Sequence, residues 1–435
     1  MLKKTILFFF GFALTSAIYS ETKNLNIRYW QLDNGAKVYF VQRSEIPMLD
    51  IRVIFNAGSA QDGANFGLAN LTNAMIGENT ENQDADGIAR AFENVGAQLS
   101  SNMNRDMACV SLRTLVNPEF LTPALKTFQA VLSQANFPKT ALKRAQQQAI
   151  AQVKSQEEDP WQLAANQFYQ TIYTKQVYAH NPLGNIASIK LIQRDQLVKF
   201  YKKFYVAQNA DIILIGDITA LQAKNIAENL SKALPIGKPA PQLLIAMNLT
   251  APTLKEIHYP SQQETILFGQ VGMTRQNPDY FSLIIGNAVL GGLPLSSLLY
   301  SIVREKNGLA YVAMSSFEPL ALRGPFLIAL QTKISSAQTA LTLSKNILKQ
   351  FIQTGPTDSQ LKAAKDNLIA RFPLTLFTNR GMLTVLTNIA FYHQPLDYLD
   401  HYVNHINAVT TRSVHSAFQK NIDLNKMATI TVGSK

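Results

Sequence analysis

The chain repeats itself once, at a period of about half its length. The segment "LKRAQQQAIAQ" at 142–152 is similar to "LKAAKDNLIAR" at 361–371, an offset of 219 residues (361 − 142). A second pair, "IQRDQLVKFYKKFYVAQNADIILIG" ending at Gly216 and "INAVTTRSVHSAFQKNIDLNKMATITVG" ending at Gly433, is offset by 217 residues (433 − 216). Two matches at nearly one offset indicate a duplicated domain, because solenoid repeats have periods of about 20–50 residues.

The first half mixes strands and helices without strict βαβ alternation. Alternating apolar residues predict a hairpin around Asn34 and Gly35, then strands over "LDIRVIFNAGS", "AQLSSNMN" and "MACVSLRTL". Helical spacing predicts helices in five further segments, near 67–78, 84–95, 118–135, 138–157 and 160–173. This pattern indicates an α+β fold with two duplicated domains, in each of which a mostly antiparallel sheet packs with several helices.

The start of the chain and a proline-rich stretch near its middle mark the domain boundaries. Residues 1–20 combine a lysine pair with an apolar run of about a dozen residues, which is the pattern of a secretory signal peptide. The stretch "LPIGKPAPQLLIAMNLTAPTLKE" carries four prolines and predicts a linker over 236–250 between domains at 21–235 and 251–435. We therefore expect a periplasmic or secreted protein without stable membrane insertion, since the apolar run is shorter than the span of about 20 residues that a bilayer requires.

Charge and cysteine content limit the classes of function. Without the first twenty residues, 38 basic residues (40 minus two lysines) face 29 acidic ones, a net charge of +9 (38 − 29). The excess is spread along the chain without a block of five Lys or Arg residues, so nucleic-acid binding is not expected. The only cysteine, Cys109, cannot form an internal disulfide and lies in an apolar alternation that favours a buried structural thiol.

Five segments in one order carry a resemblance to a known family. They are "LDNGAKVYFVQ", "VIFNAGSAQDGANFGLANL", "EEDPWQLAANQFYQTIY" with "HNPLGNIASI", "ADIILIGDI", and "VLGGLPLSSLLYSIVREKNGLAYVAMSSF". Together with the duplication, they make the chain resemble the pitrilysin and insulinase type of zinc metallopeptidases, the inverzincins, in their short processing-peptidase-like branch. The resemblance implies that the two domains form half of a clamshell.

Active members of that family carry an H-x-x-E-H motif on the helix that follows "GS". Its two histidines bind Zn²⁺, its Glu activates the zinc-bound water, and a Glu on a later helix is the third ligand. Alignment of "GLANLTNAM" with this motif places Asn70 and Ala74 at the histidine positions and Asn73 at the position of the catalytic Glu. All three positions are therefore degenerate.

The substituted residues lack the chemistry of the family. Ala74 has no donor atom, and Asn73 cannot take up a proton near neutral pH. The third ligand would fall near Ala151 or Gln152, and no Asp or Glu occurs from 120 to 156. We therefore expect no metal and no cofactor in this chain, and no peptide hydrolysis by this chain alone.

The second half keeps another part of the family pattern. The segment "SIVREKNGLAYVAMSS" of this chain resembles a signature in the second half of the family's proteins. In that signature, an Arg at a helix end and a Tyr at the start of the next strand face the catalytic chamber, and the corresponding residues here are Arg304 and Tyr311. The family uses them to hold the substrate backbone and to stabilise the oxyanion. Without the resemblance, Arg304 is a cation on a helix end capped by Gly308, and Tyr311 is a half-buried strand residue. The chain departs from the family loop "G-G-G-x-x-S-R-L" at Leu293 and Ser297.

Other candidates have simpler interpretations. His401 and His405 have i, i+4 spacing beside Asp400, which could hold a metal, but no third ligand is evident and a solvated helix face is favoured. His180 is expected to cap or hydrogen-bond a turn. The segments "FPLTLF" (372–377) and "LTVLTNIAFY" (383–392) have helical spacing and are expected in the core.

These observations lead to one favoured function and two alternatives. The favoured function is a non-catalytic subunit of an exported two-subunit peptidase, in which a homologous subunit brings the zinc and this chain offers Arg304 and Tyr311 to small unfolded peptides. One alternative is a peptide-binding or assembly scaffold without a role in proteolysis, against which the retained "REKNGLAY" argues. The other is an active enzyme with relocated ligands such as His401 and His405. Homodimerisation stays open.

Overall fold

The computed structural model describes residues 26–244 and 246–433. The predicted signal peptide at 1–20 lies outside these residues. In the first half, the strands are β1 (Arg28–Gln31), β2 (Lys37–Gln42), β3 (Met48–Phe55), β4 (Gln98–Met103), β5 (Ala108–Leu115) and β6 (Ala210–Gly216). Its α-helices are α1 (Leu68–Ala74), α2 (Ala85–Glu93), α3 (Pro118–Ser133), α4 (Lys139–Glu157), α5 (Pro160–Tyr173), α6 (Ile186–Leu191), α7 (Arg194–Phe204) and α8 (Ala220–Lys232).

The second half repeats the plan of the first. Its strands are β7 (Thr253–His258), β8 (Gln263–Val271), β9 (Ala310–Phe317), β10 (Pro325–Lys333) and β11 (Ala428–Gly433). Its helices are α9 (Tyr280–Asn287), the π-helices η4 (Ala288–Gly292) and η5 (Tyr300–Lys306), α10 (Ala337–Thr354), α11 (Asp358–Leu376), α12 (Asn379–Phe391), α13 (Tyr398–Ala408) and α14 (Thr411–Asn421).

Each half contains one mixed sheet that is mostly antiparallel. The first has the order β1-β2-β6-β3-β5-β4 and the second the order β7-β11-β8-β10-β9. The pairs β2–β6 and β7–β11 are parallel and their neighbours antiparallel, so the second sheet reproduces the first without a counterpart of β1. The hairpin expected at Asn34 and Gly35 joins β1 to β2, with Gly35 at φ 90°. The α+β class with two duplicated domains is confirmed.

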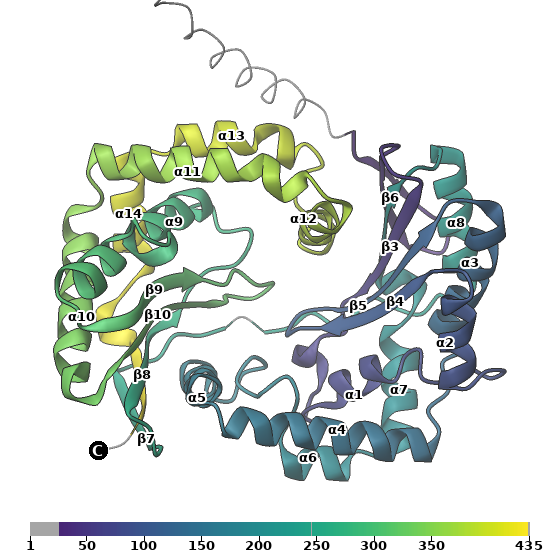
Figure 1. Ribbon diagram of the computed structural model, residues 1–435, viewed down its shortest axis with the longest axis horizontal. Coiled ribbons are helices and arrows are strands. Elements are labelled where there is room, and N and C mark those ends of the chain that lie inside the picture. The colour runs from purple at the N-terminus through teal and green to yellow at the C-terminus, as the bar shows by residue number, and fades with distance from the viewer. Residues whose placement is uncertain (1–25, 245, 434–435) are drawn as a thin grey trace, which may run out of the picture.

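The two halves exchange one helix each. The helix α5, from the first half, packs on β8 and β11 of the second sheet, and α12, from the second half, packs on β3 and β6 of the first (Figure 1). Buried side chains such as Phe168 of α5 and Leu386 of α12 join apolar clusters that contain residues from both halves. Each half thus has a main apolar cluster of its own, and two further clusters join the halves.

The expectation for the apolar segments near α12 is partly wrong. The segment 383–392 lies in the cluster between the halves, as predicted. In "FPLTLF", by contrast, Leu374 and Phe377 are 71% and 77% exposed. Residues 372–376 form the last turn of α11, which ends at Leu376, and Phe377 lies in the turn before α12. Leu374 therefore lies on the outer face of α11, whereas Leu376 of the same segment is buried.

The loop between β4 and β5 connects the halves by polar contacts. Asp106, which is 2% exposed, accepts hydrogen bonds from the hydroxyls of Tyr178 and Tyr392 and from the backbone N–H of Ala321. Burial raises the pKa of Asp106, and the hydrogen bond from Tyr178 partly opposes this rise. Buried polar groups of this kind require complete hydrogen bonding, so the loop holds a defined geometry between the halves.

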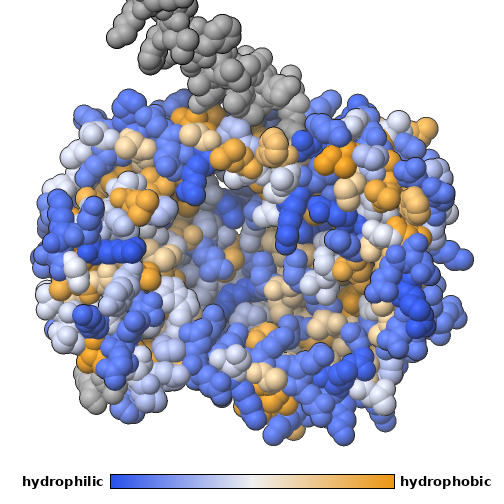
Figure 2. Space-filling model, in the orientation of Figure 1, coloured by the Kyte–Doolittle hydropathy of each residue, from blue (hydrophilic) through white to orange (hydrophobic). Residues whose placement is uncertain are grey.

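The visible surface is mostly hydrophilic. Figure 2 shows hydrophobic residues in scattered patches on this face, which is hollowed between the two halves. Within the described ranges, no helix combines the length and apolar character needed to cross a membrane.

Candidate functional site

The first turn of α1 is held by a buried carboxylate. Asp62 accepts hydrogen bonds from the backbone N–H groups of Gly67 and Ala69, at 2.8 and 2.7 Å. The Nε2 atom of His180 lies 3.0 Å from the Asp62 carboxylate, and its ring stacks on Phe66. Burial raises the pKa of Asp62, and the contact with His180 partly opposes this rise. His180 is thus a hydrogen-bonding residue of this turn, as predicted.

The three degenerate positions lie on α1 in different environments. Asn70 is half-buried and Ala74 is exposed. Asn73 is 3% exposed, and its amide oxygen accepts a hydrogen bond from the hydroxyl of Tyr205 at 3.1 Å. The side chain at the position of the family's catalytic Glu is therefore engaged in the core and cannot act as a base on a water molecule.

The helix that would bring the third ligand also lacks a donor. The helices α1 and α4 pack together, but Ala151 and Gln152 of α4 are exposed and carry no carboxylate. Across residues 26–244 and 246–433, the His, Cys, Asp and Glu side chains form no group of three or more that could hold a metal ion. The residues present at this site therefore do not fit the zinc ion of the family.

Arg304 lies near the end of the π-helix η5, which agrees with the expected position at a helix end. Its side chain is exposed, and the guanidinium carbon lies 5.0 Å from the centroid of the Tyr300 ring. Gly308 adopts φ 60°, and its N–H donates to the carbonyl of Arg304 at 3.0 Å. The N–H of Leu309 donates a hydrogen bond to the carbonyl of Val303, and β9 packs in contact with η5. Short π-helices of this type occur often at functional sites.

Tyr311 lies on a β-bulge at the edge of the second sheet. Ala310 pairs with Thr332 and Val312 pairs with Gln331, which leaves Tyr311 without an opposite residue on β10. Such a bulge bends the strand and redirects a side chain. Tyr311 is 53% exposed. The short turn after Arg304 thus presents a phenol and a guanidinium from adjoining elements.

The loop that departs from the family pattern has a particular backbone. Leu293 and Ser297 are buried, whereas Leu295 between them is 71% exposed and adopts φ 68°. The hydroxyl of Ser297 has no hydrogen-bond partner among the described residues. The substitutions thus change the interior of this loop, which leads directly into η5, since the carbonyl of Ser297 accepts a hydrogen bond from the N–H of Ser301 at 2.9 Å.

The histidine pair on α13 forms ordinary surface contacts. His401 lies 3.2 Å from the carboxylate of Asp397, one turn earlier, and His405 stacks on Phe281. Both histidines are exposed. Asp397, and not the neighbouring Asp400, is the carboxylate that contacts His401 in the structure.

The fold and this site together define a class of protein. A duplicated α+β architecture carries a helix where a zinc peptidase has its metal-binding motif, and that helix has no metal ligands. The family model for insulinase (peptidase family M16) matches residues 38–185, and the model for the peptidase M16 inactive domain matches residues 191–368. The chain belongs to the M16 insulinase family.

Comparison with individual proteins supports this assignment. A solved peptidase M16 inactive domain from Pseudomonas fluorescens is 36% identical, with a TM-score of 0.91, over 94% of this chain and 99% of that one. The non-peptidase homolog YmxG of Helicobacter pylori is 26% identical over 408 residues, which cover 92% of this chain and 93% of the relative. The periplasmic protease PqqL from Escherichia coli is 15% identical and shares the fold, with a TM-score of 0.77, over 94% of this chain but 48% of its own longer chain.

Proposed function

We propose that this chain is the non-catalytic subunit of an exported two-subunit zinc peptidase. A homologous subunit with an intact H-x-x-E-H helix supplies the zinc and the general base, and this chain closes the other side of the peptide chamber. The observation that carries the proposal is a contrast within the chain. Asn73 is engaged in the core by Tyr205, whereas Arg304 and Tyr311 remain exposed on adjoining elements.

The two retained side chains have the chemistry of transition-state binding. A tyrosine hydroxyl donates to the oxyanion that forms when water attacks a peptide carbonyl, and a guanidinium holds a substrate carbonyl through two donors. In the described part of the chain, Arg304 forms no ion pair with an acidic side chain. Its charge is therefore available to a substrate or to a partner subunit.

The edge position of β9 suggests how a peptide is bound. As the last strand of its sheet, β9 has no neighbouring strand on one side among the described residues. An extended peptide can add to such an edge through backbone hydrogen bonds, beside Tyr311. Peptides must be unfolded and small to bind in this way within a chamber.

The likeness to PqqL is consistent with pairing. This chain matches about half of that longer protein in fold, so two chains of this length together have about the length of one PqqL chain. The proposed partner is therefore a second chain of similar length that carries the zinc motif. Export rests on the signal-peptide pattern of residues 1–20.

The test is a peptidase assay of the purified chain alone, of a zinc-motif homologue from the same organism alone, and of the two together. The mixture is expected to cleave unstructured peptides much faster than either chain. Arg304→Ala and Tyr311→Phe should each lower turnover of the mixture by about 100-fold, the usual loss of one oxyanion donor, without weakening assembly. Lys306→Ala, on the same helix, and Tyr29→Phe, a comparably exposed tyrosine, serve as matched controls.

Two outcomes would contradict the proposal in different ways. Activity of this chain alone that a chelator abolishes would show an intact metal site elsewhere in the chain. A mixed complex whose turnover is unchanged by both Arg304→Ala and Tyr311→Phe would support the scaffold alternative.

A further inference from the structure

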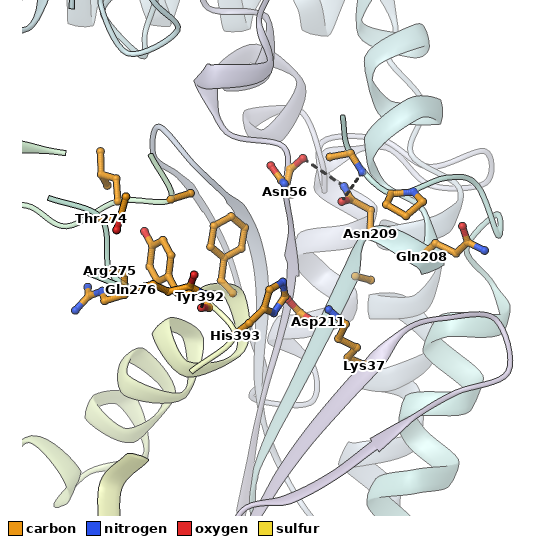
Figure 3. Close-up of a pocket in the computed structure, with 16 residues that line it drawn as sticks. Lys37, Asn56, Gln208, Asn209, Asp211, Thr274, Arg275, Gln276, Tyr392 and His393 are labelled. Atoms are coloured by element: carbon orange, nitrogen blue, oxygen red, sulfur yellow. Dashed lines mark hydrogen bonds between the residues drawn. The ribbon is translucent and has the colours of Figure 1, made fainter. Parts of the chain in front are cut away.

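A cavity of about 400 Å³ lies between the two halves, beyond the end of α12. Its walls carry polar and charged side chains from both halves, together with Phe391 and Tyr392. Figure 3 shows His393, Asp211 and Lys37 close together on one side and Thr274, Arg275 and Gln276 on the other. The size lies within the range of small-molecule sites, about 300–1,000 Å³.

Two opposite charges in this cavity lack direct partners. Lys37 on β2 and Asp211 on β6 are register partners on adjacent parallel strands. Asp211 is only 9% exposed, yet among the described residues neither its carboxylate nor the Lys37 ammonium makes a hydrogen bond or an ion pair. A carboxylate that is mostly removed from water and has no donor from the protein is costly.

The duplicated half shows that packing does not require these charges. At the 217-residue offset Asp211 corresponds to Ala428 (428 − 211), whose parallel partner is Thr253 in place of Lys37. There the helix α5 covers the second sheet as α12 covers the first, with uncharged residues at both positions. The same helix-on-sheet contact is thus built without a buried ion.

The Asp211 charge also costs stability where it stands. Burial raises the pKa of Asp211 to about 7, although the nearby Lys37 opposes the rise. Burial, followed by the charge of Lys37, lowers the pKa of His393, so the imidazole is neutral near pH 7 and Lys37 is the cation on this wall. Groups that reduce stability in a cavity are a general mark of a binding site.

We propose that this cavity binds a free α-amino acid, with the α-ammonium on Asp211 and the α-carboxylate on Lys37. Adjacent strands lie about 4.8 Å apart, so these two side chains start close together on one wall. In a free amino acid the ammonium and carboxylate groups are attached to the same carbon, so one molecule can contact Asp211 and Lys37 at the same time. In a peptide the two charged ends are separated by about 3.3–3.6 Å for each residue, which fits this pair of charges less well.

The rest of the cavity accommodates the ligand's side chain. The amides of Gln208 and Gln276 and the hydroxyl of Thr274 provide polar contacts, and the rings of Phe391 and Tyr392 provide apolar surface. Because the walls come from both halves, a bound amino acid also contacts both halves. Neither Arg304 nor Tyr311 lines this cavity, and the proposal does not depend on the proposed role in proteolysis.

The test is calorimetric titration of the purified full chain at pH 8 with the twenty L-amino acids, first in pools and then singly. At least one amino acid is expected to bind, and its N-acetyl and carboxamide derivatives should bind at least about tenfold more weakly, because each has lost one ionic contact. Asp211→Asn and Lys37→Met should each weaken binding by about tenfold or more, whereas Asp33→Asn, at an exposed site in the same half, should not.

Three outcomes would overturn the proposal. The first is that no pool gives heat at about 10 mM of each amino acid, a concentration that nearly saturates a site with a Kd of about 1 mM. The second is equal binding of the zwitterion and both blocked derivatives, and the third is unchanged binding in Asp211→Asn. Circular dichroism of each variant shows whether a loss of binding reflects loss of the fold. Lys37→Met, which keeps an apolar stem on the strand, provides an independent second variant.

Discussion

At the scale of single residues, Asn73 shows the limits of motif comparison. The motif alone identifies Asn73 as the residue in place of a catalytic Glu. Only the structure shows that its amide oxygen is bonded to Tyr205, a tyrosine 132 positions later in the chain. Likewise, the apolar alternation around Cys109 predicted a buried thiol, and Cys109 is buried in β5 between the first sheet and α12. Local pattern predicts burial well but does not predict a partner.

A prediction at this scale concerns Asp211. Its folded pKa of about 7 lies above the ordinary value of 3.8, so the stability it contributes is fully present below about pH 4 and is lost as the pH rises through 7. Asp211→Asn removes this loss, and thermal or urea unfolding at pH 8 should show a variant more stable than the wild type by up to roughly 4 kcal/mol. The gain should disappear near pH 4.

The control for Asp211→Asn is Asp33→Asn at an exposed site, which should leave the pH dependence unchanged. The groups that face Asp211 are Lys37 and Tyr39 on β2 and His393 after α12, and all are kept in the variant. If the stability difference between wild type and variant is the same at pH 4 and pH 8, the carboxylate is not held at a raised pKa.

At the scale of elements, periodicity predicted most helices and strands within a few residues. The helices α3, α4 and α5 begin and end close to the predicted limits, because Pro118 and Pro160 start two of them and their apolar residues follow the helical period. The bulge at Tyr311 and the π-helices were not predicted. They arise from how β9 pairs with β10 and packs on η5, and local sequence does not determine that pairing.

The loop that carries Asp106 provides a prediction at this scale. Asp106→Ala leaves the hydroxyls of Tyr178 and Tyr392 and the N–H of Ala321 without their acceptor in a buried position. Each unsatisfied buried group costs about 1–3 kcal/mol, so the free energy of unfolding measured in urea at pH 7 should fall by at least about 3 kcal/mol.

Tyr392→Phe removes one of the three donors and should lower the free energy of unfolding by less than Asp106→Ala does. A loss below about 1 kcal/mol for Asp106→Ala would show that water replaces the carboxylate and that the loop does not hold the halves together.

At the scale of the whole molecule, the exchange of α5 and α12 makes the two halves interdependent. Each sheet is covered on one face by a helix from the other half (Figure 1). The linker at 236–250 therefore separates the two sheets and the main apolar cluster of each half, but two further apolar clusters contain residues from both sides.

This interdependence predicts the behaviour of fragments. Residues 21–235 expressed alone expose the face of the first sheet that α12 covers, and residues 236–435 expose the face that α5 covers. Each fragment is expected to aggregate or to unfold without cooperativity, because a large apolar face is left in water. When co-expressed, the fragments should elute together from a sizing column as one particle. A monomeric first fragment that unfolds cooperatively and as stably as the intact chain would show that the exchanged helix is dispensable.

The sequence by itself determined the duplication, the α+β class, the positions of most helices and the absence of zinc ligands at the family positions. These properties depend on residue identity and local periodicity. Only the tertiary structure decided which sheet α5 and α12 cover, the exposure of Tyr311 on its bulge, and the cavity that brings Lys37, Asp211 and His393 together. These features join segments up to about 350 residues apart, and such pairings are set by the packing of whole elements, which no local pattern records.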